Sequence, residues 1–353
     1  MISSCLHHGG RGRYNNFMRY IYRGDEDEII PREATHIFVC AKIIPRRAFQ
    51  NHPNIIEVIC RKDVEKIGSW AFAKCRYLRR AIMPGVKILE WHAFIRCESL
   101  EDVECGKLEI IGQDAFHGCY SLRSINLPSA RIAERGAFSE CFALTDVKFS
   151  NKLERFEEGV FLLCESLRRI TIPLKDGMIT ADNIFQGCSN FGQVVLVDEE
   201  LRETISALQL VDWKSDINEE IDSINQILPK TWAGQFGEGG KAQEIRTWIR
   251  AVLRKIIHYK GEHEGLLDEA AATLQVGVPR DIVMNGVLHF LELPSHTFEV
   301  EDESDDEEDD NVEAKDDGEV SEGDEVNDQN DDQNRHIFCC LRKWPCPMRK
   351  ERD

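Results

Sequence analysis

Six cysteines are the first residues in this sequence whose spacing could support chemistry. Each lies three residues after a phenylalanine: Cys75, Cys97, Cys119, Cys141, Cys164 and Cys188. Thiols in register could bind a metal or take part in redox reactions, but metal sites need clustered ligands with Cys-x-x-Cys spacing. Cysteine is also a small hydrophobic residue that proteins often bury. We therefore expect a ladder of buried thiols and no metal site.

A glycine-rich loop and two histidines are the next candidates. The loop at 234–240 leads into Gly239-Gly240-Lys241, but a phosphate-binding loop would have glycine in place of Gln235 and Ser or Thr in place of Ala242. His258 and His263 are five residues apart, whereas a helical metal pair is separated by four, so they are expected at a cap or on the surface. We predict no catalytic residue and no cofactor. An enzyme with an unrecognised site in residues 198–298 is the alternative.

The last candidates are three cysteines near the end of the chain. Cys339, Cys340 and Cys346 lie among basic and aromatic residues, which is typical of an S-acylation site, because one lipid chain and a polybasic patch together give stable membrane binding. Half of a metal site, an unstructured tail and a tail that folds back on the preceding acidic run are alternatives. Acylation would make the protein a membrane-tethered adaptor.

The element that must position the six cysteines is a repeat anchored on phenylalanine. Further apolar columns follow six, nine and eleven residues after each anchor, and the two-residue spacing and β-branched content of the last pair predict a strand. Another inward position precedes each anchor by five residues, with Ala133 and Thr180 as weak copies. Since one coil cannot bury these side chains alone, we predict seven stacked coils over residues 43–197. The anchors are Phe49, Phe72, Phe94, Phe116, Phe138, Phe161 and Phe185.

The best-preserved coil runs from Ile111 to Pro128 and reads Ile-Gly-x-x-Ala-Phe-x-x-Cys-x-x-Leu-x-x-Ile-x-Leu-Pro. This pattern resembles the BspA-type (Treponema-type) leucine-rich repeat, and the layout of the chain is similar to diatom leucine-rich repeat proteins of unassigned function. The resemblance implies a right-handed solenoid in which each coil has a strand and a short helical turn. It also implies recognition of a protein by the repeat surface, with no common catalytic residues.

The outward-facing positions of the predicted strands are the candidate binding face. Their charge changes sign from coil to coil, so cross-strand pairs could satisfy much of this surface internally. The mixture of signs also argues against nucleic acid, because a phosphate-binding groove keeps one sign. A cluster of exposed apolar residues here would favour a protein partner, whose identity the sequence does not give. The candidate residues are Ile56, Ile59, Arg79, Arg80, Ile82, Glu101, Asp102, Arg123, Asn126, Arg168 and Arg169.

The negative charge of the chain is concentrated near its end. Of 63 acidic and 44 basic residues, 20 acidic and one basic lie between Glu299 and Asp332, so the rest is neutral overall. We expect no strongly charged global surface. No stretch has the roughly 18 to 20 apolar residues of a membrane span, and the N-terminus lacks an apolar signal core. Together with the absence of Asn-x-Ser/Thr, this favours a cytoplasmic, reducing setting with free thiols.

Six segments follow from these patterns. We predict a disordered N-terminus at 1–19, a cap at 20–42 and the repeats at 43–197. A helical module at 198–298 is expected to cap the last coil, with an apolar face of Ile217, Ile221, Ile224 and Leu228 in one helix. A second helix begins near Ile245, and a third, at residues 266–274, would cover its apolar stripe. An acidic disordered tether at 299–334 and a basic tail at 335–353 complete the chain.

Overall fold

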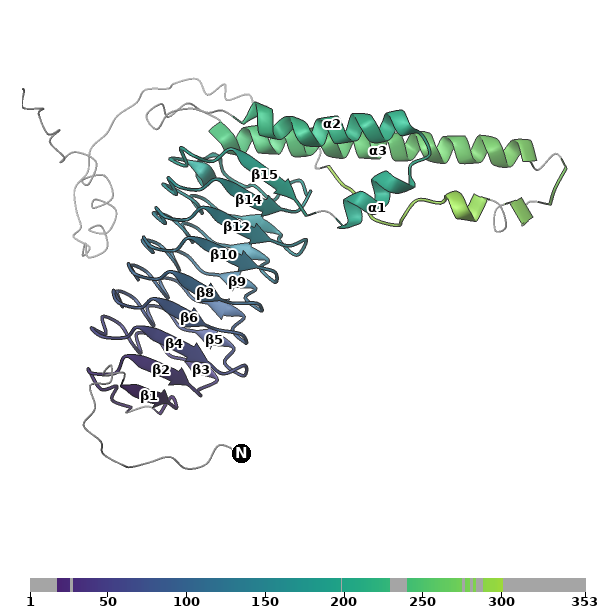
Figure 1. Cartoon of the computed structure of the whole chain (residues 1–353). Coiled ribbons are helices and arrows are strands. Elements are labelled where there is room, and N and C mark those ends of the chain that lie inside the picture. Colours follow the sequence, from purple (N-terminus) through teal and green to yellow (C-terminus); the bar gives the residue numbers. More distant parts are fainter. Residues whose placement is uncertain are drawn as a thin grey trace, which may run out of the picture. The chain divides into compact units, whose positions relative to one another are not determined.

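A computed structural model describes residues 18–25, 28–197, 199–228, 240–274, 277–279, 282–283 and 288–300. They belong to one compact unit, Met1–Asp302, drawn in colour in Figure 1. The predicted disordered N-terminus, apart from its last two residues, lies outside this part of the chain. So do the acidic tether, apart from Glu299 and Val300, and the whole basic tail.

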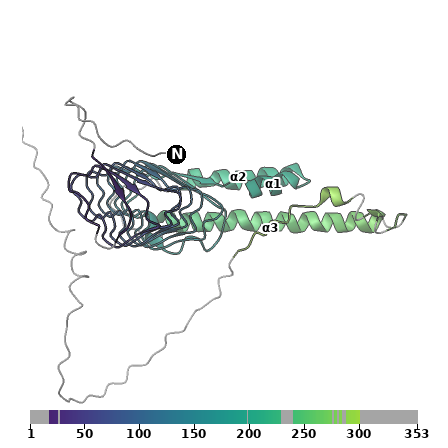
Figure 2. The ribbon, with the colours of Figure 1, turned by 90° about the horizontal axis from the view of Figure 1, so that it is seen from below.

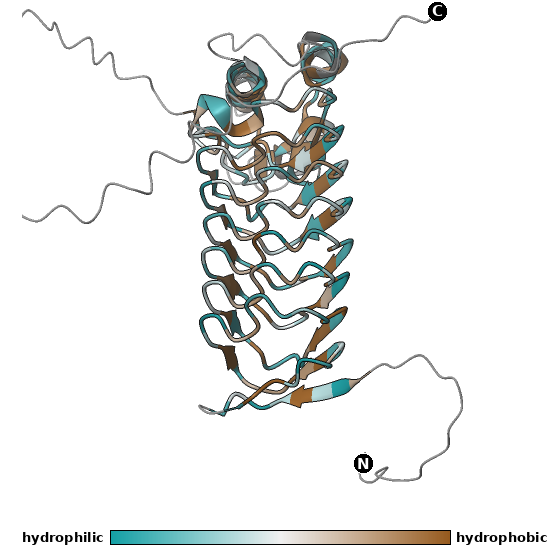
Figure 3. Ribbon diagram, turned by 90° about the vertical axis from the view of Figure 1, so that its left-hand side faces the viewer, coloured by the Kyte–Doolittle hydropathy of each residue, from teal (hydrophilic) through white to brown (hydrophobic). Residues whose placement is uncertain are grey.

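The repeats form a stack of coils with parallel strands on two sides (Figure 1, Figure 3). The front carries a five-stranded sheet of β1 (Arg19–Tyr22), β2 (His36–Val39), β4 (Glu57–Cys60), β6 (Arg80–Ile82) and β8 (Asp102–Glu104). A four-stranded sheet continues it with β10 (Ser124–Leu127), β12 (Asp146–Phe149), β14 (Arg169–Ile172) and β15 (Gln193–Leu196). The back carries a six-stranded sheet of β3 (Ile43–Ile44), β5 (Lys66–Ile67), β7 (Ile88–Leu89), β9 (Ile110–Ile111), β11 (Ile132–Ala133) and β13 (Arg155–Phe156).

The anchor phenylalanines stack into one continuous column inside the coils, as the period predicts. All seven are buried, and the ring centroids of successive anchors lie 4.8 to 5.6 Å apart with interplanar angles of 2 to 8°. Offset aromatic pairs contribute about 0.5 to 1.5 kcal/mol beyond the area they bury. The column therefore links every coil to the next through the same contact.

The six cysteines form the expected buried ladder, and each thiol also donates a hydrogen bond. Cys75 Sγ lies 3.0 Å from the carbonyl oxygen of Phe49, in the preceding coil. The other five repeat this contact at 3.0 to 3.3 Å. In the first coil His52 replaces cysteine, and its Nε2 lies 3.0 Å from Pro31 O in the cap. Across the described ranges, no group of His, Cys, Asp and Glu is arranged to hold a metal ion.

This burial predicts which thiols react in the native protein. Cys40 is half-buried, whereas the other eight cysteines of the described ranges are buried. We expect iodoacetamide to alkylate Cys40 in the native chain and to leave the six ladder thiols intact until denaturant is added. Peptide mass spectrometry reads the result. Rapid alkylation of Cys97 or Cys119 without denaturant would show that the ladder is not closed.

Each of the first six coils bends at two backbone positions with positive φ, two residues before and two after the anchor, and the last coil keeps the second of them, Gly187. In the second coil these are Trp70 (φ 61°) and Lys74 (φ 59°), and in the fifth they are Gly136 and Glu140. A left-handed residue costs roughly 1–2 kcal/mol unless it is glycine. Hydrogen bonds between coils offset this cost, as from Phe49 N to Ala71 O (2.7 Å) and from Asn51 N to Ala73 O (2.8 Å).

The last coil departs from the predicted inward position before the anchor. Thr180 is exposed, and Ile179, only 3% exposed, takes the inward place and pairs with Phe156 of the preceding coil. The prediction for Thr180 is wrong because the step from Phe161 to Phe185 is the longest of the six, which shifts the offset by one residue. The extra residue is accommodated by the 3₁₀-helix η1 (Asp182–Phe185).

Helices follow the last coil: α1 (Glu199–Ala207), α2 (Val211–Ile227), α3 (Gly240–Leu274) and the 3₁₀-helix η3 (Leu288–Leu291). α2 and α3 lie at the end of the stack and continue beyond its edge (Figure 1, Figure 2). The predicted separate helix at 266–274 is wrong, because α3 runs unbroken through Gly261 and Gly265, both of which face open space. The apolar stripe of α3 is covered instead by α2 and η1, its main contacts. Among the described helices, none is long and apolar enough to span a bilayer.

Two cations at the start of α3 cap the last coil. In earlier coils a backbone carbonyl accepts an N–H from the following coil, as Ile67 O does from Glu90 N at 2.9 Å. The equivalent carbonyl of the last coil, Ile179 O, accepts from the Arg246 guanidinium at 3.5 Å. Lys241 Nζ donates to Cys188 O and Phe191 O at 2.7 and 2.6 Å. Side chains supply these donors because an α-helix uses most of its own N–H groups internally.

Candidate protein-binding surface

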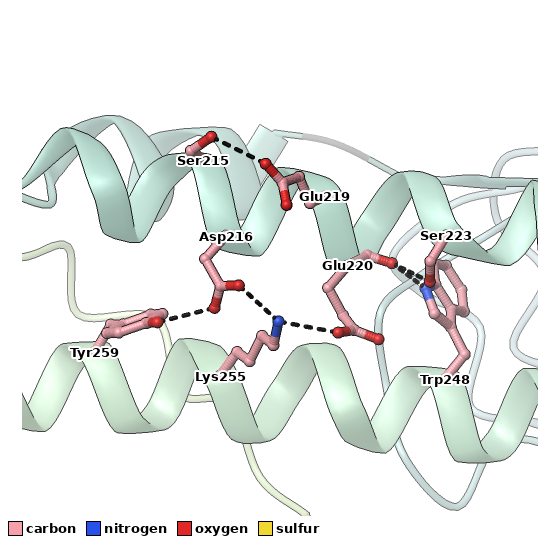
Figure 4. Close-up of polar contacts among 8 residues, drawn as sticks. All are labelled: Ser215, Asp216, Glu219, Glu220, Ser223, Trp248, Lys255 and Tyr259. Atoms are coloured by element: carbon pink, nitrogen blue, oxygen red, sulfur yellow. Dashed lines mark hydrogen bonds and ion pairs between the residues drawn. The ribbon is translucent and has the colours of Figure 1, made fainter.

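The helical module contains one polar cluster with the residue types of an acid–base site (Figure 4). Lys255 Nζ lies 2.9 Å from Asp216 Oδ1 and 3.0 Å from Glu220 Oε2, and the Tyr259 hydroxyl donates to Asp216 Oδ2 at 2.8 Å. The two carboxylates belong to α2, and the lysine and tyrosine belong to α3. The cluster therefore joins the two helices directly.

The pKa values in this cluster move away from neutrality. Hydrogen bonds from Lys255 and Tyr259 lower the pKa of Asp216, and the Asp216 carboxylate raises the pKa of both Lys255 and Tyr259. A catalytic acid or base works best when its pKa lies near the operating pH. The arrangement is therefore that of a clamp holding α2 on α3, in which Asp216, Lys255 and Tyr259 keep their ordinary charges.

Two other candidate residues from the sequence analysis contact backbone carbonyls of the protein itself. Lys241, 9% exposed, is committed to the two carbonyls of the last coil; residues 234–239 of the glycine-rich loop lie outside the described part. His263 was expected at a cap or on the surface, but it is 1% exposed. Its Nε2 lies 2.8 Å from Leu291 O, because η3 packs over this part of α3.

The eleven candidate face residues lie on the outer side of the front strands or directly before them. These residues are divided between the five-stranded and the four-stranded sheet, because β8 and β10 are neighbours in the stack but belong to different sheets. Seven belong to the five-stranded sheet and its approaches: Ile56, Ile59, Arg79, Arg80, Ile82, Glu101 and Asp102. The remaining four accompany the four-stranded sheet: Arg123, Asn126, Arg168 and Arg169.

Charged residues on the five-stranded sheet form a network centred on Arg80. Its guanidinium contacts Asp102 at 3.0 Å, Glu57 at 3.9 Å and Glu104, while Arg79 contacts Glu101 at 3.3 Å. On the other sheet Arg169 pairs with Asp146. Exposed pairs of this kind contribute about 0–1 kcal/mol each. Among the described residues, neither Arg123 nor Arg168 forms an ion pair. The predicted pairing of charges within the candidate binding face is thus found in part of that face.

Beside this network four apolar side chains line up across consecutive strands. Strand register places Ile21 of β1 opposite Phe38 of β2, Phe38 opposite Ile59 of β4, and Ile59 opposite Ile82 of β6. Ile21 is 48% exposed and the other three are half-buried, whereas the alternate residues Tyr22, Val39 and Cys60 are buried in the core. We call Ile21, Phe38, Ile59 and Ile82 the apolar column.

Sequence reasoning found half of this column. Ile59 and Ile82 were candidates, but Ile21 and Phe38 were assigned to a cap with no binding role. Their signal was present, because both hold the outward phase of a period-two strand. What was missing was the register that aligns the cap strands with the repeats.

Comparison with known proteins supports the repeat assignment. Residues 42–133 and 87–205 match the family model "BspA type Leucine rich repeat region", with six copies. Among solved structures, the chain is similar to a leucine-rich repeat protein of T. pallidum, at 28% identity over 43% of this chain and 73% of that one, with a TM-score of 0.39. A leucine-rich repeat protein of Bacteroides ovatus matches at 21% identity over 48% of each chain, with a TM-score of 0.38.

No curated protein matches the chain. The family match covers the same coils in which the phenylalanine column, the thiol ladder and the two rows of parallel strands recur. Residues 42–205 therefore form a BspA-type leucine-rich repeat region.

Proposed function

We propose that this protein is a non-enzymatic scaffold that binds another protein through the five-stranded face of its repeats. Leucine-rich repeat solenoids generally mediate protein–protein interaction. The observation that carries the proposal is the apolar column, four large apolar side chains aligned on the solvent side of one sheet. A contiguous, solvent-facing apolar strip rimmed by charge is typical of an interaction site.

The charged network beside the column fits this role. Arg80 and its three carboxylate partners form a polar border that is already paired, so a partner covering the apolar strip need not leave an isolated charge buried. Interfaces commonly combine such a rim with an apolar centre that carries most of the binding energy. The helical module extends the scaffold beyond the last coil and provides further surface for the same kind of contact.

The double substitution Ile59→Thr/Ile82→Thr tests the proposal. Threonine keeps the β-branched shape that suits a strand but replaces apolar surface with a hydroxyl. We expect partners cross-linked to the wild-type chain in its native cell to be recovered at least tenfold less with the double variant. Quantitative mass spectrometry of the cross-linked material measures the ratio.

A matched control separates binding from folding. Asn126→Thr changes the same outward position on β10, in the four-stranded sheet, and should leave recovery unchanged. Thermal unfolding of all three proteins should agree within a few degrees. If the double variant keeps every partner of the wild-type chain, the five-stranded face is not the binding site.

The cysteines bear on the cellular environment of the protein and on a second candidate function. We place the scaffold in a reducing, cytoplasmic environment, which is supported by nine unpaired cysteines in the described ranges. The membrane-tethered adaptor adds an S-acylated tail to the same scaffold. Its candidate residues Cys339, Cys340 and Cys346 lie outside the described residues, so this function stays a prediction from their basic and aromatic neighbours.

A further inference from the structure

The apolar column has a length and a spacing that can be compared with a partner's secondary structure. Neighbouring strands in a sheet lie about 4.7–4.9 Å apart, so the three steps from Ile21 to Ile82 span roughly 14 Å. Within the strands the column is bordered by polar residues at the other outward position: Arg19, His36, Glu57 and Arg80.

The two ends of the column differ in charge. In register, Ile82 is followed by Glu104 of β8. Three carboxylates lie here against two guanidinium groups: Glu101, Asp102 and Glu104 against Arg79 and Arg80. At the opposite end β1 carries the exposed Arg19. A partner lying along the column would thus meet an acidic end at β8 and a basic residue at β1.

An α-helix fits this strip better than a strand does. Same-face residues of a strand recur about every 6.6–6.8 Å, so a strand crossing the sheet would meet the two ends of the column and fall between its two inner members. A helix advances about 5.4 Å per turn, and residues at i, i+4, i+7 and i+11 span roughly 16 Å on one face. Four helical side chains can therefore meet four members of the column. The positive end of the helix dipole is favourable near carboxylates.

We propose that the apolar column is the docking site for an amphipathic helix of a partner protein. The helix is about three turns long and crosses β1, β2, β4 and β6. Its N-terminal turn carries Lys or Arg and lies over the carboxylates of β8. This inference rests on the proposed function and names the kind of partner that the same surface takes.

A synthetic helix tests the inference on the full-length protein. The probe is a 15-residue fluorescent peptide with leucine at positions 3, 7, 10 and 14, lysines in its first turn, and a side-chain lactam to hold the helix, because short peptides are marginally helical in water. Fluorescence anisotropy measures its affinity. We expect saturable binding that Ile59→Thr/Ile82→Thr weakens at least tenfold, and that Asn126→Thr leaves unchanged.

Two further comparisons test the orientation and the kind of partner. The double variant Asp102→Asn/Glu104→Gln, or a peptide with its lysines moved to the last turn, should weaken binding at least threefold. A peptide with leucine at alternate positions should bind more weakly than the helical one. The inference is overturned if the helical peptide fails to saturate, ignores the isoleucine substitutions, or is matched by the alternating peptide.

The cross-linking result separates failure of this inference from failure of the proposed function. If partner recovery depends on Ile59 and Ile82 but the helical peptide does not bind, the surface binds protein and the partner is not a helix. If recovery is also independent of these isoleucines, the proposed function itself fails.

Discussion

Raising the pH above about 9 should destabilise the repeat region steeply, because its buried thiols must stay protonated. Burial raises the pKa of Cys60, Cys75, Cys105 and Cys141 from 9.0 to about 12, and raises that of Cys97, Cys119 and Cys164 well above 9.0. The unfolded chain releases these protons near pH 9, whereas the folded chain keeps them. The stabilisation is therefore complete below pH 9 and is lost as the pH rises from 9 towards 12.

The size of this effect follows from the number of thiols. Each thiol lowers the free energy of unfolding by roughly 1 kcal/mol per pH unit in that window. Within about one to two pH units, the seven losses together approach the whole stability of a typical domain. Lys241 opposes this trend, because burial lowers its pKa below 10.5. Between that lowered pKa and pH 10.5 the folded chain binds fewer protons than the unfolded chain. The seven thiols outweigh this single lysine.

Denaturant unfolding measured from pH 7.5 to 10 checks this expectation. The free energy of unfolding should be flat below pH 8.5 and then fall with a slope of several protons. The variant Cys97→Ala/Cys119→Ala is the control: it should be less stable at neutral pH but should show a slope smaller by two protons. A free energy that stays constant up to pH 10 would contradict the closed thiol ladder.

Replacing Lys241 by methionine should loosen the end of the solenoid. Methionine keeps the apolar stem but removes the ammonium group, leaving Phe191 O without this donor, while Cys188 O keeps the N–H of Phe191 at 3.2 Å. Charged hydrogen bonds contribute about 1.5–3 kcal/mol each, and a buried carbonyl left without a partner costs about 1–3 kcal/mol. We expect a loss of roughly 2–4 kcal/mol, with faster hydrogen exchange in β14 and β15.

Lys214→Met is the matched control for this prediction. Lys214 Nζ also donates to a backbone carbonyl, Ser206 O at 2.8 Å, but this contact is exposed. The control should change stability by less than about 0.5 kcal/mol, which is usual for exposed polar contacts. If Lys241→Met is equally mild, then α3 caps the last coil through its apolar face, and the ammonium group contributes little.

The repeat was predictable from the sequence because the same contacts recur from coil to coil. Each coil places the same residue types at the same offsets, so Phe72 meets Phe94 and Cys75 lies near Phe49 once the coils stack. The bends were not predictable in this way. Residues as different as Trp70, Leu163 and Gly187 hold positive φ, because hydrogen bonds between coils impose the conformation and the side chain does not select it.

The binding face was partly predictable for the same reason. Outward positions within the coils follow from the period, and Ile59 and Ile82 were found that way. Ile21 and Phe38 lie before the first coil, where no repeat fixes the offset, and only the pairing of β1 with β2 and of β2 with β4 aligns them.

The sequence alone determined the solenoid, its buried phenylalanine and cysteine columns, and the outward positions of its strands, because stacking identical offsets leaves one arrangement that buries all the apolar side chains. Tertiary structure alone decided what its other chemically suggestive residues do. Lys241 binds carbonyls 50 and 53 residues before it, and Asp216 contacts Lys255 across two helices. Contacts between segments so far apart depend on how the helices dock on the last coil, which no local spacing encodes.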